Sequence, residues 1–145
     1  MSKKPGWLDV GFIAHRGTLL NSVAWRSRSI PLVHILERLE LEQLAHAGTS
    51  NGQLFVSFEQ FVEYGISRKS IKPAIQLGTD LGLLSRTALA PARSHTIRPA
   101  QGYRLNYLPG LNAKAPTDEW ARVSEVAAAK HVKTYKATMA KRNRS

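Results

Sequence analysis

Residues 54–84 read LFVSFEQFVEYGISRKSIKPAIQLGTDLGLL, and this stretch predicts two short helices joined by a glycine turn. The first helix is expected over residues 58–64, because three apolar residues recur there on one helical face: Phe58, Phe61 and Val62. Ser57 and Gln60 form the capping-box pair that starts such a helix. Gly65 suits the left-handed backbone that follows a helix end, so the chain is expected to turn there.

The second helix of this stretch has an apolar side and a basic side. Ile66 is expected to point into the core, and Ser67 to cap the helix. The apolar side carries Ile71, Ala74, Ile75 and Gly78, and the basic side carries Arg68, Lys69, Lys72 and Gln76. Pro73 removes one backbone hydrogen bond and clashes with the preceding turn. The helix is therefore either kinked at Pro73 or altered at its start. We favour a tightened first turn or a later start with Ser70 as the cap.

A β-hairpin is predicted after the second helix. Residues 81–84 pass from a helix end into a strand, and residues 102–106 form the returning strand, with Tyr103 and Leu105 on one face. Residues 54–56 supply a short third strand. A short helix, a glycine turn, a basic helix and a hairpin wing follow one another in winged helix-turn-helix proteins. The predicted fold class is therefore α+β, mainly α, with a small β-hairpin wing and a C-terminal helical extension.

The same residues resemble a family of winged-helix proteins from bacterial plasmids, phages and other mobile elements. The matching segments are residues 23–26, 51–57, 64–68, 74–75 and 81–84. Together they cover roughly residues 20–108. The resemblance implies a DNA-binding winged helix that places residues 67–76 in the major groove. It leaves the biological role open, because members of such families act as regulators, replication factors and excision factors.

Charge and composition indicate the class of partner. The 145 residues carry a formal net charge of +11 and have a sequence pI of about 10.5. That balance favours nucleic acid over an anionic membrane surface, although a ribosome-associated or simply basic protein is the alternative. The chain has no cysteine, which excludes disulfides and thiolate metal sites. No apolar run approaches ~18 residues and no secretory signal is evident, so we expect a bacterial cytoplasmic, nucleoid-associated protein.

Four segments are predicted along the chain. They are a basic N-terminal arm with apolar anchors (1–28), the winged helix-turn-helix domain (29–108), a linker (109–116) and a basic C-terminal helix and tail (117–145). Ser29 and Pro31 mark the start of a scaffold helix over 31–47. Its outer face is acidic through Glu37, Glu40 and Glu42, so it is expected to lie away from DNA.

The last helix is predicted to start at Thr117, which can cap it. Asp118 and Glu119 would then fall in the first turn, where the helix dipole favours negative charge. Trp120, Val123 and Val126 give this helix only a thin apolar stripe. Its far end is cationic, and residues after about 137 are expected to be disordered.

The predicted DNA contacts belong to the second helix, the wing and the arm. Arg68, Lys69 and Gln76 are the candidates for base edges, since arginine and lysine bond guanine and glutamine bonds adenine. The expected phosphate contacts on this helix are Ser67, Ser70 and Lys72. The wing adds Arg86, Arg93, His95 and Arg98 for the backbone or minor groove, and the arm adds Arg26 and Arg28, which are solvated in the alternative interpretation.

No pattern in the sequence argues for an enzyme. It has no phosphate-binding glycine loop, and its ten acidic residues form no pair at metal-ligand spacing. We expect no cofactor and no metal. The partners expected are double-stranded DNA and, on DNA, further copies of the chain as a homodimer or multimer, with no membrane.

Three functions are compatible with this sequence. The preferred function is a sequence-specific transcription regulator. The alternative is a replication-initiation, excision or architectural factor of a mobile element. A third is a protein-interaction module that uses Trp7, Phe12 and Trp120 as anchors.

Overall fold

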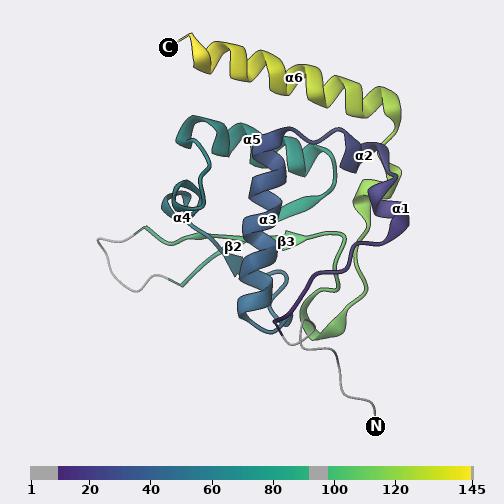
Figure 1. The fold of residues 1–145 in the computed structure, drawn as a ribbon, viewed down its shortest axis with the longest axis vertical. Helices are drawn as coiled ribbons and strands as arrows, with labels where there is room; N and C mark the ends of the chain where they lie inside the picture. The colour runs from purple at the N-terminus through teal and green to yellow at the C-terminus, as the bar shows by residue number, and fades with distance from the viewer. Residues whose placement is uncertain (1–9, 92–97, 145) are drawn as a thin grey trace.

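Three short antiparallel strands form a small sheet in the order β1-β3-β2 (Figure 1). The computed structural model describes residues 10–91 and 98–144. Strand β1 (Leu54–Phe55) pairs with β3 (Gln101–Leu105), and β3 pairs with β2 (Leu84–Leu89). About half of the chain is helical, so the fold is α+β. The strands predicted around residues 54, 84 and 103 are confirmed.

Helix α3 (Ile30–Ala45) runs through the middle of the molecule and packs on helix α5 and on strands β1 and β3 (Figure 1). It starts as predicted, because the Ser29 side chain accepts a hydrogen bond from the Leu32 amide at 3.2 Å. Its inward face belongs to the hydrophobic core: Leu32, Ile35, Leu36 and Leu39. The predicted acidic face is partly neutralised, since Glu42 forms an ion pair with Arg38 at 3.0 Å.

Helix α4 (Phe58–Glu63) and the turn after it follow the prediction closely. Ser57 and Gln60 make both hydrogen bonds of the capping box. Gly65 has a φ of +109°, which is the left-handed backbone that only glycine adopts freely. Ile66 then points into the core and is 3% exposed. The glycine turn therefore aims α5 across the end of α4.

Helix α5 (Arg68–Asp80) is continuous through Pro73, and the prediction of a later start at Ser70 is wrong. Ser67 occupies the N-cap position, but its side chain makes no capping hydrogen bond. Pro73 has no amide hydrogen, so the carbonyl of Lys69 lacks its usual partner within the helix. Arg142 Nη1, from the far end of the chain, lies 3.4 Å from that carbonyl oxygen. The proline is tolerated where a side chain from another helix replaces part of the lost bonding.

Helix α6 (Glu125–Asn143) lies along α5 on the outside of the fold (Figure 1). It starts eight residues after Thr117, because the capping side chain is Ser124, which accepts from the Ala127 amide at 3.1 Å. The predicted start at Thr117 is therefore wrong. The helix also continues to Asn143, so the predicted disorder after residue 137 is wrong as well.

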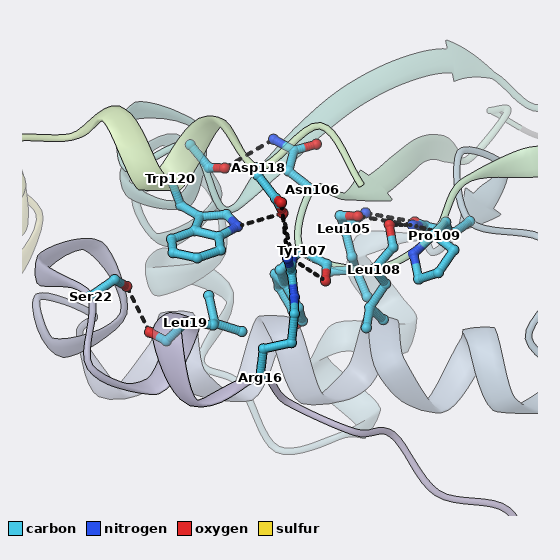
Figure 2. Close-up of polar contacts among 12 residues, drawn as sticks. Arg16, Leu19, Ser22, Leu105, Asn106, Tyr107, Leu108, Pro109, Asp118 and Trp120 are labelled. Carbon is cyan, nitrogen blue, oxygen red and sulfur yellow. Dashed lines mark hydrogen bonds and ion pairs between the residues drawn. The ribbon is translucent and has the colours of Figure 1, made fainter. Parts of the chain in front are cut away.

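The described part of the N-terminal segment packs into the same core and is not a free arm. Helices α1 (Gly17–Leu20) and α2 (Val23–Arg26) are each one turn long. They bury Leu19, Ala24 and Trp25 in the hydrophobic cluster that also holds α3 and α5 side chains. Arg16 holds the start of this segment in place. Its Nη1 donates a hydrogen bond to Asp118 Oδ2 at 3.0 Å, and its guanidinium lies over the ring of Trp120 (Figure 2).

Two further short helices connect the sheet to α6. They are the 3-10 turns η2 (Leu111–Ala113) and η3 (Glu119–Arg122). Buried Asn51 ties this connection to the sheet, since its side chain bonds the backbone of Leu105 (2.7 and 2.8 Å), Leu108 and Pro109. The sequence pattern predicted only a turn at this asparagine. Across residues 10–91 and 98–144, no helix is long and apolar enough to cross a membrane.

Candidate nucleic-acid interface

The outward face of α5 carries four exposed polar side chains: Arg68, Lys69, Lys72 and Gln76. The helical repeat separates them from the buried face, which carries Ile71, Ala74, Ile75, Leu77 and Gly78. Helix α3 and strand β2 can both approach α5 closely, because position 78 of α5 has no side chain. A Cβ atom there would lie 2.8 Å from Leu32 and 2.9 Å from Leu84. The core therefore holds α5 from behind and leaves its polar face outward.

Two of these polar residues have acidic partners in the free chain. Arg68 Nη2 lies 2.9 Å from Glu59 Oε1, with side chains 60% and 69% exposed. The hydrogen bond from Arg68 holds the pKa of the Glu59 carboxyl below its usual range. Gln76 donates to Asp80 at 2.9 Å. An ion pair as exposed as Arg68–Glu59 contributes little free energy, so it costs little to separate.

Ser70 is not part of this surface. It is only 7% exposed, because it lies one turn before Ala74 on the side of α5 that faces the core. The predicted phosphate contact at Ser70 is therefore corrected. Ser67, in contrast, is exposed at the start of the helix.

The β-hairpin brings two arginines beside the α5 face. A cleft of about 430 Å³ is lined by Lys72 and Gln76 from α5 and by Arg86 from β2. A second cleft, of about 530 Å³, has Arg68 on one side and Arg98 on the other. The structure thus groups predicted residues from two separate stretches of sequence. The predicted contacts at Arg93 and His95 lie outside the described residues.

Arg26 and Arg28 lie elsewhere, beside α6. The guanidinium of Arg28 stacks 3.5 Å above the centre of the Trp25 ring, and its Nε donates to the Trp25 carbonyl at 2.7 Å. Burial lowers the pKa of this guanidinium. Arg26 remains exposed. The predicted arm contacts are therefore not joined to the α5 face.

Helix α6 adds neighbours that the sequence did not indicate. A narrow cleft of about 160 Å³ runs between the two helices, with Lys72 and Gln76 on one wall and Thr134, Thr138 and Arg142 on the other. Helix α6 therefore flanks the polar face of α5 without covering it. The only local signal for this arrangement was Pro73, whose lost hydrogen bond needs an outside donor.

The described residues include no group of three or more histidine, aspartate or glutamate side chains placed to hold a metal ion. Comparison with known protein families, with curated proteins and with solved structures found no match. The α5 face and the hairpin offer polar side chains of several kinds. They provide guanidinium, ammonium, amide and hydroxyl donors, the groups that bond phosphates and base edges.

Proposed function

We propose that this chain is a winged helix-turn-helix protein that binds double-stranded DNA in a sequence-specific way and acts as a transcription regulator. The order α3, β1, α4, α5, β2, β3 and the antiparallel sheet are compatible with that fold. The observation that carries the proposal is the polar face of α5. A cationic helix face, braced from behind and adjoined by Arg86 and Arg98 of a hairpin, fits a duplex groove.

The dimensions of α5 suit the major groove. Its 13 residues span about 20 Å, and a helix of this kind enters a groove about 12 Å wide. Arg68 and Gln76 are eight positions apart, which is about 12 Å along the axis, or three to four base pairs. Arg68 is then placed to bond a guanine, and Gln76 an adenine, at separate positions of one site.

Lys72 and Arg86 position the helix without selecting a sequence. Lys72 lies between Arg68 and Gln76 and shares a cleft with Arg86, so the two reach the same backbone strand. The net charge of +11 adds long-range attraction to the polyanion. In this proposal the protein acts on bacterial DNA in the cytoplasm.

Selection from a library of randomised duplexes tests the proposal. We expect the full chain to enrich one short motif over successive rounds. The Gln76→Ala variant should lose preference at one base position, at a cost of about 1–3 kcal/mol for the preferred base. The Lys72→Ala variant should weaken binding to all sequences alike, because a phosphate contact carries no base information.

Lys114 supplies the matched control, since it is exposed and lies in the connection before α6. The Lys114→Ala variant should keep both the affinity and the motif of the wild-type chain. Enrichment of no motif, or a Gln76→Ala variant with an unchanged motif, would contradict sequence-specific binding through α5.

A further inference from the structure

A second cationic groove lies on the other side of α6 from the polar face of α5. Its volume is about 620 Å³. One wall is the connection between α2 and α3, with Arg26 and Arg28, and the other wall is α6, with Lys133 and Lys136. Among the described residues, no acidic side chain lines it. We call this cleft, with its four cationic side chains, the α6 groove.

The cations of the α6 groove form no ion pair with the acids of residues 10–91 and 98–144. In the part of the chain that the structure describes, none of its four cations forms an ion pair with a carboxylate, whereas four arginines elsewhere do: Arg16, Arg38, Arg68 and Arg104. Glu37 and Glu40 act on Arg28 only through their charge at a distance. Four cations gathered without an acid leave a positive potential that an anion can lower.

The groove is built rather than incidental. Arg28 is held in one place by its stack on Trp25 and by its hydrogen bond to the Trp25 carbonyl. Ser29, the N-cap of the 16-residue helix α3, also lines the groove, so the positive end of that helix dipole adds to the side-chain charges. On the facing wall, Lys133 and Lys136 are three positions apart on one helix and extend from the same side.

Helix α6 separates this groove from the α5 face. Leu77 and Tyr135 line both the α6 groove and the narrow cleft beside Lys72 and Gln76, so the two sites lie back to back against one ridge. A helix with its side chains is about 10–12 Å across. A straight duplex that receives α5 in its major groove therefore meets one flank of α6, and the α6 groove on the other flank stays open.

We propose that the α6 groove is a second site for a nucleic-acid phosphate backbone, so that one chain holds two DNA segments at once. The inference takes DNA as the polyanion and to that extent rests on the proposed function. It adds a bridging activity that the α5 face alone does not provide. Such an activity fits an architectural role in addition to sequence recognition.

Sedimentation velocity of the full chain with short duplexes of about 15 base pairs tests this proposal, because such duplexes are too stiff to bend around one molecule. We expect two duplexes per chain for the wild type. The Lys133→Ala/Lys136→Ala variant should bind one, with affinity for the second weakened by about tenfold or more, since two charge-assisted contacts are lost. Both lysines are exposed on α6, and circular dichroism checks that the variant folds.

Two matched variants separate the possible outcomes. Lys114→Ala/Arg122→Ala removes the same charge from exposed positions outside both sites and should still bind two duplexes. Lys72→Ala/Arg86→Ala should keep the duplex held in the α6 groove and lose the other. One duplex per chain in the wild type, unchanged in Lys133→Ala/Lys136→Ala, would overturn the second site and leave the proposed function standing.

A wild-type chain that binds no duplex would instead overturn the proposed function itself. An equal loss in the Lys133→Ala/Lys136→Ala and Lys114→Ala/Arg122→Ala variants would show that only net charge matters, and it would overturn the groove. Vesicles rich in anionic phospholipid provide the last arm. Capture of these vesicles through Lys133 and Lys136, with no effect of those lysines on DNA, would assign the groove to a membrane and contradict the proposal.

Discussion

Pro73 shows how a single side chain couples two distant parts of this protein. It is buried in the interior of α5, where proline normally costs about 3 kcal/mol relative to alanine. The Lys69 carbonyl that it leaves unpaired is approached by Arg142, 73 positions further along the chain. The rule that proline belongs in the first turn favoured a later helix start or a tightened first turn. The later start is wrong, because the donor that compensates for Pro73 is not local in sequence.

A double-mutant cycle measures this coupling. The Pro73→Ala variant should raise the free energy of unfolding by about 1–2 kcal/mol, since the regained helix hydrogen bond exceeds the packing lost against α6. Arg142→Ala should destabilise the wild type, and destabilise the Pro73→Ala background less, because the Lys69 carbonyl then has its own partner. Urea unfolding of the four proteins gives the coupling energy.

Arg144 provides the control, because it is the exposed C-cap residue of α6, two positions after Arg142. Arg144→Ala should cost the same in both backgrounds. If Arg142→Ala also costs the same in both, the carbonyl of Lys69 is not what Arg142 stabilises.

The polar face of α5 could be predicted residue by residue, whereas its neighbours could not. The 3.6-residue repeat alone placed Arg68, Lys69, Lys72 and Gln76 outward. The same repeat, applied to Ser70, places it one turn from Ala74 and seven positions before Leu77, which is the buried side. The predicted contact at Ser70 followed its residue type and ignored that position.

The connection between β3 and α6 is held by side chains that contact residues far away in sequence. Thr117, Asp118 and Glu119 resemble a helix start, which is why the sequence predicted one there. Asp118 instead has a φ of +52° and binds Arg16, 102 positions earlier, and Trp120 is buried. A local capping pattern indicates only which nearby backbone groups a side chain can bond. It does not indicate a partner such as Arg16, which is distant in sequence. The helix therefore begins only at Glu125.

The Arg16–Asp118 pair should make stability depend on acid pH. Hydrogen bonding from Arg16 is the main cause that lowers the Asp118 pKa below the 3.8 of an unperturbed aspartate. A carboxyl whose pKa is lower in the folded state stabilises the fold above its unfolded pKa, and this stabilisation disappears as pH falls through the folded pKa. The pair should therefore contribute fully above about pH 4 and vanish at lower pH.

Asp118→Asn removes the charge and keeps a side chain that accepts the left-handed backbone. We expect this variant to lose about 1 kcal/mol at pH 7 and to approach the wild type as the pH falls through the lowered pKa of Asp118. Urea unfolding between pH 2.5 and 7 provides the measurement. A difference between the two proteins that stays constant over this range would show that Arg16 does not bind the carboxylate in solution.

Two cationic surfaces of the molecule lie on opposite sides of α6. One side joins the α5 face to Arg86 and Arg98 of the hairpin, and the other is the α6 groove. The order of α3, α4, α5 and the strands could be predicted, because each element depends on periodicity and on turn residues next to it in the sequence. The place of α6 could not, since its thin apolar stripe does not specify which surface it packs on. The α6 groove was invisible in the sequence for the same reason.

The salt dependence of binding to a duplex examines the proposed α5 interface. The logarithm of the affinity should fall linearly with the logarithm of salt concentration, with a slope of about −0.9 for each phosphate contacted. Fluorescence anisotropy with a short labelled duplex gives this slope. The Lys72→Ala/Arg86→Ala variant should flatten it by about two units, and Lys114→Ala/Arg122→Ala should leave it unchanged. A wild-type affinity that does not respond to salt, or an equal slope in all three proteins, would contradict a duplex held by α5 and the hairpin.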